Sequence, residues 1–262
     1  MNPQILKNKN IVISASAEGI GLTIAEECLK NGAKVFLTDK NEESINKIQN
    51  HKSFKKKIFA EKINASDPVE VQNYFKKLKL KIDTIDVLVN NIGIAGPTSR
   101  LEDINISEWE ETIKININSH FYYSKFSIPF LKKNKGGSII NISSTAGLFG
   151  FPFRSPYAAS KWAVIGMTKT LAMELGKYNI RVNVICPGSV NGDRMKRVIK
   201  AKAKSLRIKE SKLKKDFESM VSMNTFVEKL DVANMAIFLM TNKSSKITGQ
   251  ILTVDGNTER MN

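Results

Sequence analysis

Short runs of apolar residues alternate along this chain with longer stretches in which apolar residues recur every three or four positions. The short runs predict strands and the longer stretches predict helices. The predicted strands are Ile11–Ser14, Lys34–Thr38, Lys57–Ile63, Asp86–Asn90, Ser138–Ser143, Arg181–Cys186 and Gln250–Val254. The predicted helices are Gly19–Asn31, Glu42–Gln49, Pro68–Leu80, Ser107–Lys132, Pro156–Tyr178 and Asp231–Met240. This alternation is typical of an α/β protein with a Rossmann-type, doubly wound, seven-stranded parallel sheet and helices on both faces.

One stretch interrupts the alternation. Residues 194–216 are helix-prone and rich in Lys, and they lie between the sixth predicted strand and the last predicted helix. We expect a lid-like insertion at about residues 191–225 that covers the mouth of a site. No repeat or linker indicates a second domain, so residues 1–262 are predicted to form one domain.

Composition adds several expectations about location. No apolar run approaches the roughly 20 residues of a membrane span, and the start, Met1-Asn2-Pro3-Gln4, lacks the hydrophobic region of a signal peptide. Cys28 and Cys186 are predicted to be buried free thiols, which suits a reducing cytoplasm. With only two histidines, no Cys/His spacing indicates a metal site.

The net charge of +16 raises the hypothesis of nucleic-acid binding. The cations are spread along the chain, and only seven of the 41 are Arg. A dispersed Lys surface is usually only a solvated surface, so we expect no specific nucleic-acid binding.

The stretch "SASAEGIG", residues 14–21, follows the first strand and opens the first helix. Small residues allow a tight turn, and Gly19 and Gly21 allow a pyrophosphate to approach the helix N-terminus, where free N–H groups favour anions. Ala15 stands where such a loop normally has its first glycine. The loop keeps its shape if Ala15 has a negative φ.

Asp39, at the end of the second strand, supports this interpretation. An acid at that position can accept hydrogen bonds from both ribose hydroxyls and repel a 2′-phosphate. Glu18 adds a second negative charge, so NAD is favoured over NADP. Lys40, next to Asp39, is a cation that could tolerate the 2′-phosphate of NADP. The structural alternative is that Asp39 is only a solvated acid at the end of a strand.

A third candidate group lies in "IINISSTAGLFGFPFRSPYAASKWAV". Tyr157 and Lys161 are four apart on a predicted helix and therefore share one face. The Lys161 ammonium would lower the pKa of the phenol from its ordinary value of about 10. Tyr157 could then accept the proton of an alcohol while Ser144 holds the substrate oxygen. Taken alone, these residues also fit an ordinary amphipathic helix.

These features together resemble the short-chain dehydrogenase/reductase family over essentially the whole chain. The matching segments, in the order of the family's motifs, are "SASAEGIG", "NNIG" at 90–93, Trp109 to Asn116, "SSTAG…YAASK", "CPGSVNG" and "GQILTVDGN". Six segments in the right order are far more specific than any one of them. The departures from the family pattern are Ser14-Ala15 in place of Thr-Gly, Asn64 in place of an Asp and Gly192 in place of a Thr.

The resemblance implies a role for each matching residue. Tyr157 would be the acid/base, Lys161 would lower its pKa and bind the nicotinamide ribose, Ser144 would orient the substrate, and Asn116 would anchor a proton-relay water. The expected cofactor-binding residues are Ser14, Ser16, Glu18, Gly19, Ile20, Gly21, Asp39, Asn64, Ala65, Asn91, Gly93, Tyr157, Lys161, Pro187, Gly188 and Val190.

The rare arginines indicate the charge of the substrate. Five of the seven, namely Arg100, Arg154, Arg194, Arg197 and Arg207, lie in segments expected to flank the pocket. Arginine grips carboxylate or phosphate with two parallel hydrogen bonds. We therefore expect a small anionic hydroxy compound, held by Arg154 or Arg194. The alternatives are surface salt bridges or closure onto the cofactor phosphates.

The sequence thus predicts an NAD-dependent enzyme that interconverts a secondary alcohol and its ketone. The alternative is a 3-oxoacyl-[acyl-carrier-protein] reductase using NADPH. A non-catalytic binding protein of the same fold is a third reading, which the complete Asn–Ser–Tyr–Lys set disfavours. From the family resemblance we also expect a homotetramer, and three apolar segments at 126–131, 162–167 and 251–254 support self-association.

Overall fold

The computed structural model describes residues 4–51 and 57–260. One all-parallel, seven-stranded sheet has the order β3-β2-β1-β4-β5-β6-β7. The strands are β1 (Asn10–Ser14), β2 (Lys34–Asp39), β3 (Ile58–Lys62), β4 (Val87–Asn90), β5 (Gly137–Ile142), β6 (Ile180–Pro187) and β7 (Ile251–Val254). The helices are α1 (Gly19–Lys30), α2 (Glu42–Asn50), α3 (Pro68–Lys79), α4 (Ile106–Ile113), α5 (Ser119–Lys133), α6 (Ser155–Leu175), α7 (Asp193–Leu206), α8 (Glu210–Ser219) and α9 (Lys229–Met240). The predicted fold class is confirmed.

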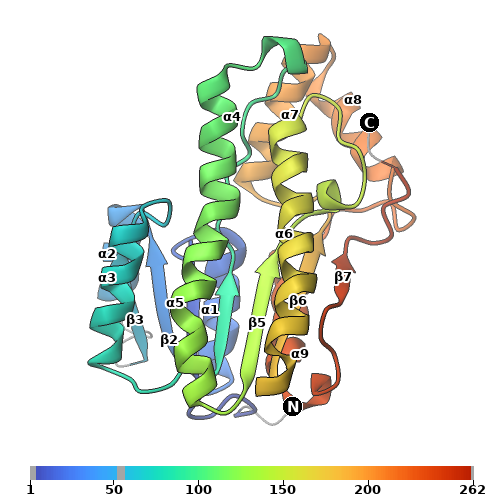
Figure 1. Ribbon diagram of the computed structural model, residues 1–262. Helices are drawn as coiled ribbons and strands as arrows, with labels where there is room; N and C mark the ends of the chain where they lie inside the picture. The colour runs from blue at the N-terminus through green and yellow to red at the C-terminus, as the bar shows by residue number, and fades with distance from the viewer. Residues whose placement is uncertain (1–3, 52–56, 261–262) are drawn as a thin grey trace.

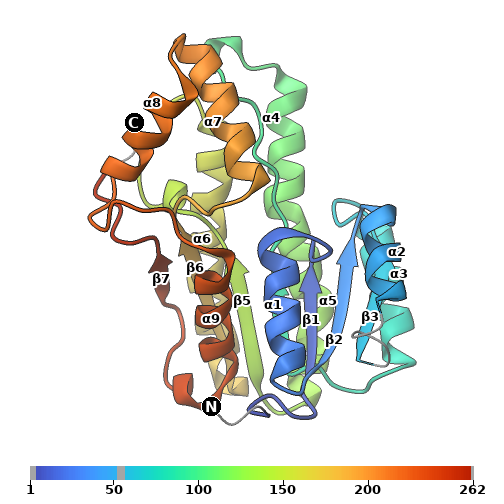
Figure 2. The same ribbon diagram turned by 180° about the vertical axis from the view of Figure 1, so that it is seen from behind.

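The helices cover both faces of this sheet. Helices α3, α5 and α6 lie over one face, in front of the strands in Figure 1, and α1 and α9 lie over the other, as Figure 2 shows. Strands β1 and β4 are neighbours, although two strand–helix units separate them in the chain. The strand order therefore reverses between them, and ligands of such sheets bind at this reversal, outside the carboxyl ends of the strands.

The core consists of two layers, one on each side of the sheet. Strand β4 is buried at all four positions, which explains why it reads as a continuous apolar run and not as an alternating one. One apolar layer packs the sheet against α1 and α9, and the other packs it against α3 and α5. These layers hold the loops at the carboxyl edge of the sheet in fixed positions.

The prediction of one continuous helix over Ser107–Lys132 is wrong in one respect. It is divided into α4 and α5 by a π-helical turn, η3, at Lys114–Asn118. A π-turn adds one residue to a helical turn while the apolar spacing around it stays close to that of an α-helix. The sequence pattern therefore showed the helix and not the turn, and the turn contains Asn116.

Residues 193–219 form α7 and α8, which stand above the carboxyl edge of the sheet in Figure 1. They have a small apolar core of their own that includes Ile199, Leu213 and Phe217. This segment also carries eleven Lys and Arg residues against four Asp and Glu, so the excess of positive charge is larger here than elsewhere.

Three further observations concern the described residues. No described helix has the length and apolarity needed to cross a membrane. Their His, Cys, Asp and Glu side chains form no group that could hold a metal ion. Cys28 and Cys186 are both buried and free. Met1 to Pro3, on which the expectation about a signal peptide partly rests, lie outside the described residues.

Candidate active site

The loop between β1 and α1 has the features of a phosphate cradle. Glu18 is the N-cap of α1 and makes no side-chain capping bond, so the N–H groups of Gly19, Ile20 and Gly21 open the helix without a capping side chain. Gly19 has φ +62°, and a Cβ built on it meets nothing within 4 Å. The backbone there is open to a ligand, and the helix N-terminus favours a negatively charged one.

Gly21 is required for a different reason. A Cβ at this position would lie 2.6 Å from both the Ala15 carbonyl oxygen and Asn91 Nδ2. Asn91 Nδ2 donates to that same carbonyl oxygen at 2.7 Å, which ties the end of β4 to the first loop. The close approach of helix and loop therefore leaves no room for a side chain.

Ala15 differs from expectation. Its φ is +49°, in the left-handed region, and not negative. The turn thus keeps the conformation that glycine would adopt, and the alanine accepts the strain of its methyl group. In this conformation the Ala15 carbonyl oxygen accepts the hydrogen bond from Asn91 Nδ2.

Ser14 and Ser16 are fully buried, and their hydroxyl groups serve the loop itself. Ser16 Oγ donates to the Ile13 carbonyl oxygen at 2.8 Å. Ser14 Oγ accepts from the Asn91 N–H at 3.2 Å. Both hydroxyl groups are therefore used to build the loop.

Two acids lie at the end of β2. Asp39 accepts hydrogen bonds from the Ala17 N–H (3.1 Å) and the Asn41 N–H (3.0 Å), so its carboxylate is held in place by the backbone. Glu18 accepts from Ser44 Oγ at 2.5 Å. Negative charge is therefore fixed where the ribose of a dinucleotide on this loop would lie, while Lys40 beside it is exposed.

The other expected cofactor residues occupy the same edge of the sheet. Asn64 follows β3, but its Oδ1 already accepts from the N–H and the hydroxyl of Ser66, at 3.2 and 2.9 Å. Ala65 lies beside it and is half-buried. An adenine amine would compete with Ser66 for the Asn64 oxygen.

Pro187 is the last residue of β6, and the turn that follows it, with Gly188 and Val190, contacts other parts of the chain. A Cβ on Gly188 would lie 2.8 Å from Asp255 Cβ. Val190 forms a parallel bridge with Val227, just before α9. Gly192, where the family commonly has Thr, has φ +143°, a conformation that L side chains rarely adopt.

Tyr157 and Lys161 lie one turn apart near the start of α6, as the spacing predicts. Lys161 is 3% exposed, and its Nζ donates to the Ile142 carbonyl oxygen at the end of β5 (3.0 Å). A Cβ on Gly93 would lie 3.1 Å from this Nζ. The loop after β4 can therefore pass beside the ammonium because residue 93 has no side chain.

The side chain of Asn116 makes three hydrogen bonds, to two residues. Its Oδ1 accepts from the Ile94 N–H at 2.7 Å, and its Nδ2 donates to the Ile94 carbonyl oxygen (3.1 Å) and to Ser160 Oγ (3.0 Å). Ser160 Oγ donates in turn to the Tyr157 carbonyl oxygen at 2.7 Å. The π-turn thus connects the loop after β4 to the helix that carries Tyr157.

The phenol of Tyr157 has a lowered pKa. Burial on its own raises this pKa, but neighbouring groups outweigh burial and favour the phenolate. These groups are, in decreasing order of effect, Arg194, Lys161, the hydrogen bond with Ser144, and Arg154. Burial also lowers the pKa of Lys161, while the phenolate of Tyr157 opposes that change.

The two arginines singled out in the sequence both lie against Tyr157. The guanidinium carbon of Arg154 lies 5.1 Å, and that of Arg194 5.9 Å, from the centre of the phenol ring. Arg154 is 2% exposed, and its NH2 group donates to the Ala95 carbonyl oxygen at 2.6 Å. Arg194 lies at the start of α7 and donates to the Gly93 carbonyl oxygen at 3.1 Å.

Two contributors to this site were missed in the sequence. Ser160 was overlooked because a serine inside a helix carries no signal of its own, although its position three after Tyr157 is where it can reach that carbonyl. The effect of Arg194 on the phenol was also missed, because 37 positions separate it from Tyr157 and only the packing of α7 brings it close.

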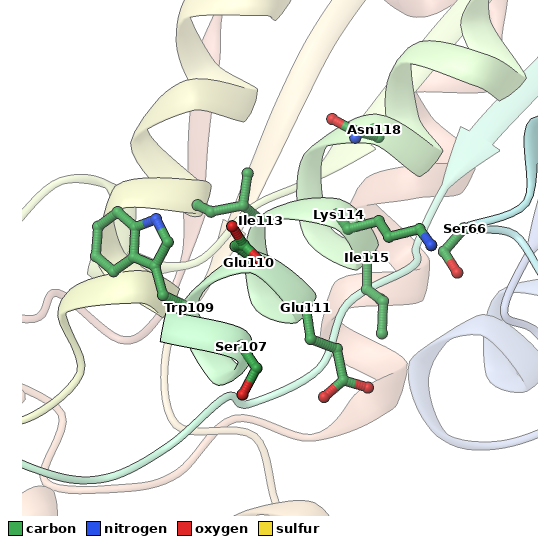
Figure 3. A pocket seen from close by; sticks show the side chains of 9 residues that line it. All are labelled: Ser66, Ser107, Trp109, Glu110, Glu111, Ile113, Lys114, Ile115 and Asn118. Atoms are coloured by element: carbon green, nitrogen blue, oxygen red, sulfur yellow. The ribbon is translucent and has the colours of Figure 1, made fainter. Parts of the chain in front are cut away.

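A separate hollow of about 550 Å³ lies along α4 and the π-turn. Figure 3 shows Lys114 extending across it toward Ser66, which follows β3. Its lining residues are Ser66, Ser107, Trp109, Glu110, Glu111, Ile113, Lys114, Ile115 and Asn118. They include none of the expected catalytic or cofactor residues, so this hollow is distinct from the site around Tyr157.

Comparison with known proteins agrees with this geometry. A family model described as "Enoyl-(Acyl carrier protein) reductase" matches residues 14–257. Trans-4-hydroxycyclohexanecarboxylate dehydrogenase of Sinomonas cyclohexanicum is 35% identical over 95% of this chain and 92% of its own. The 3-oxoacyl-[acyl-carrier-protein] reductase FabG of Thermotoga maritima is 32% identical over 96% and 98%. The solved structure of ElxO with NADP bound is 30% identical, with a TM-score of 0.85 over 95% and 98%.

The chain therefore belongs to the short-chain dehydrogenase/reductase family of oxidoreductases. Members of this family use NAD or NADP, and the residues around the first loop fit such a dinucleotide. Gly19 leaves the backbone open at an uncapped helix N-terminus, and Asp39 faces the same loop.

Proposed function

We propose that this protein is an NAD-dependent oxidoreductase that interconverts a small secondary alcohol and its ketone. The observation that carries the proposal is the environment of Tyr157, whose pKa is lowered by three cations and a serine despite burial. A general acid/base works best when its pKa lies near the working pH. A tyrosine with a purely structural role would not need a lowered pKa.

Each catalytic residue has a role in this proposal. In the oxidative direction the phenolate of Tyr157 accepts the hydroxyl proton, and Ser144 positions the oxygen. Lys161 stabilises the phenolate, and Asn116 anchors a water through which the proton leaves. When bound, the dinucleotide would supply the acceptor for the hydride, that is, for the carbinol hydrogen together with the electron pair of its C–H bond. In the reductive direction Tyr157 returns the proton to the ketone oxygen.

NAD is proposed over NADP because of the acids at the end of β2. The Asp39 carboxylate is held by two backbone N–H groups, so it cannot easily turn away from a 2′-phosphate. Glu18 lies beside it and is anchored to Ser44. Both carboxylates would repel the 2′-phosphate of NADP, and this repulsion would weaken its binding.

The proposed substrate is a small hydroxy compound with an anionic group. Neither Arg154 nor Arg194 belongs to an ion pair among the described residues, where the recorded pairs are all made by lysines. The cationic segment α7–α8 would attract anions to the mouth of the site. A relative that acts on a hydroxycyclohexanecarboxylate, as its name states, supports the same class.

The decisive experiment is a substrate screen that measures the reduced cofactor by its absorbance. Each alcohol or ketone is assayed with NAD(H) and with NADP(H), starting with trans-4-hydroxycyclohexanecarboxylate. Turnover that prefers NAD and disappears in Tyr157→Phe supports the proposal. Turnover that survives in Tyr157→Phe, or none with any alcohol or ketone, contradicts it.

A second candidate function is reduction of a 3-oxoacyl group on acyl carrier protein with NADPH. It is supported by the Thermotoga maritima relative and by the positive charge of α7 and α8, which suits an acidic carrier. The acids at the end of β2 oppose it. Assaying acetoacetyl groups on the carrier with NADPH and NADH tests this candidate directly, and a rate higher than with any free hydroxy acid would favour it.

We further propose a cytoplasmic homotetramer. Large apolar side chains are exposed on α5 and α6, among them Phe121 at 48% and Trp162 at 50%. Where such side chains form a contiguous apolar patch, that patch commonly marks an interface between protein chains. Light scattering at micromolar concentration should give four times the mass of one chain, and Trp162→Lys should lower it. A monomeric wild type would contradict this proposal.

A further inference from the structure

Three positive charges surround the ring of Tyr157. The Lys161 ammonium lies 5.7 Å from the ring centre, and the guanidinium groups of Arg154 and Arg194 lie 5.1 and 5.9 Å from it. No carboxylate of the described residues pairs with any of the three. The phenol is thus placed in a positive field that no described acid neutralises.

The two arginines differ in their availability to a ligand. Arg154 is buried and donates to the Ala95 carbonyl oxygen (2.6 Å) and to Thr98 Oγ1 (3.3 Å), so it joins two loops of the fold. Arg194 is exposed, and its one recorded hydrogen bond goes to the neutral Gly93 carbonyl oxygen. A carboxylate could form a charge-assisted, bidentate pair with Arg194, which is stronger than its hydrogen bond to the Gly93 carbonyl oxygen.

We propose that Arg194 is a specificity-determining residue that couples the charge of the substrate to the chemistry of Tyr157: it binds the anionic group of the substrate, and in doing so it alters the acid–base state of the phenol. The inference rests on the proposed function. It assigns the anion to Arg194 and leaves Arg154 as a structural support.

The coupling follows from the position of Arg194. Its guanidinium lies 5.9 Å from the centre of the phenol ring, and it is the exposed cation of the three, whereas Lys161 and Arg154 are buried. Its charge also favours the phenolate. The groups that face the phenol come from several elements: Lys161 from α6, Arg154 from the N-cap position just before α6, Ser144 from the loop after β5, and Arg194 from α7. A bound carboxylate neutralises the charge of Arg194 while the others stay fixed. The pKa of Tyr157 should therefore rise when an anionic substrate binds, and stay unchanged with a neutral one.

A simpler reading is that Arg194 only latches α7 to the loop after β4 through Gly93. In that case its removal would loosen the covering segment and would slow charged and neutral substrates equally. The two readings are separated by a charged substrate and its uncharged isostere, and by a measurement that needs no substrate.

The kinetic test compares trans-4-hydroxycyclohexanecarboxylate with its carboxamide. Arg194→Met should lower kcat/KM about 30-fold or more for the carboxylate and less than about threefold for the amide, because only the first loses a charge-assisted contact. Arg194→Lys keeps the positive charge but cannot form a bidentate pair, so it should give an intermediate loss of kcat/KM for the carboxylate. Arg197→Met is the matched control, an exposed arginine one turn along α7, and should behave as wild type. Equal losses for both substrates in Arg194→Met overturn the inference.

The substrate-free test follows tyrosinate absorbance with pH, with Tyr157→Phe subtracted to isolate one phenol. Arg194→Met should titrate at higher pH than wild type, and Arg197→Met should not. Acetate, compared with chloride at equal ionic strength, should move the wild-type titration to higher pH and leave Arg194→Met unmoved. An acetate effect of the same size in both proteins, or in neither, overturns the inference.

The outcomes also separate the inference from the proposed function. If no alcohol is turned over, or if Tyr157→Phe stays active, the proposed function fails whatever the titration shows. If Tyr157→Phe is inactive while Arg194→Met treats charged and neutral substrates alike, the proposed function stands and the role of Arg194 is rejected.

Discussion

The two ends of the site differ in charge and in how that charge is held. At the end of β2, the carboxylate of Asp39 is fixed by the N–H groups of Ala17 and Asn41. Around Tyr157, Arg154 and Arg194 donate to neutral oxygens, and neither is recorded in an ion pair among the described residues. The acid at the end of β2 is held by hydrogen bonds from the protein itself, whereas the cations around Tyr157 have no acidic partner among the described residues.

This difference indicates what each end is prepared to bind. In the proposed function, the fixed acid at the end of β2 would accept hydrogen bonds from ribose hydroxyl groups and repel a 2′-phosphate. Buried or crowded cations without acidic partners are costly unless something neutralises them. The site around Tyr157 is therefore suited to a ligand that brings negative charge, and the predictions below test these two descriptions against each other.

The largest effect should come from Tyr157→Phe. The ring and its packing remain, but the proton-transfer group is lost, and general acid–base catalysis contributes about 10²–10⁴-fold. We expect kcat to fall by about a thousandfold, with the Kd for NAD unchanged within about threefold. Steady-state kinetics and a cofactor titration measure the two effects separately. A kcat close to that of wild type would exclude Tyr157 as the acid/base.

The pH dependence of the wild type has a definite sign. Alcohol oxidation needs the phenolate, so its rate should rise with pH and level off above the pKa of Tyr157, which lies below the ordinary value for tyrosine. Ketone reduction needs the phenol and should fall over the same range. A rate of oxidation that falls with rising pH in this range would contradict the assignment.

The sequence predicted the parts of this picture that depend on local pattern or fixed spacing. The strands, the sharing of one helix face by Tyr157 and Lys161, and the open turn at Gly19 all follow from residues close together in the chain. The π-turn at Asn116 could not be predicted, because one extra residue in a turn leaves the apolar spacing almost unchanged. The approach of Arg194 to Tyr157 depends on how α7 packs, and no local pattern encodes that.

Gly21→Ala should have the second-largest effect, and it acts at the cofactor end alone. The added Cβ would lie 2.6 Å from the Ala15 oxygen and from Asn91 Nδ2, both of which hold the loop. Overpacking of this kind costs about 1–3 kcal/mol, so we expect NAD affinity to fall by about tenfold or more. The titration of Tyr157 should stay unchanged, which would show that the two ends are independent. A normal Kd for NAD would contradict the description of the loop.

Asp39→Asn should have a smaller effect on total activity and a visible one on cofactor choice. Asparagine can still accept from the Ala17 N–H, so the loop keeps its anchor while the charge is removed. We expect kcat/KM with NAD to fall by about threefold to tenfold and the preference for NAD over NADP to narrow by about tenfold. Glu18→Gln should narrow it less, because Glu18 is directed to Ser44. A wild type that already prefers NADP would reverse the reading of this end.

The smallest effect is expected at Ala15, which stands where the first loop of the family has a glycine. Its left-handed φ of +49° costs roughly 1–2 kcal/mol for an L-residue, and Ala15→Gly would remove that cost. Glycine, however, loses about 0.5–1 kcal/mol more conformational entropy on folding. It also gives up the methyl that packs against the second core layer, and burying a methylene-sized group is worth about 0.8 kcal/mol at most. The three effects nearly cancel, so the free energy of unfolding should change by less than about 1 kcal/mol in denaturant titrations. NAD affinity should stay within about twofold, because the Ala15 carbonyl already reaches Asn91 in the strained conformation. A tenfold gain in affinity would show that the missing glycine weakens the loop, and that the cofactor end is less complete than its hydrogen bonds indicate.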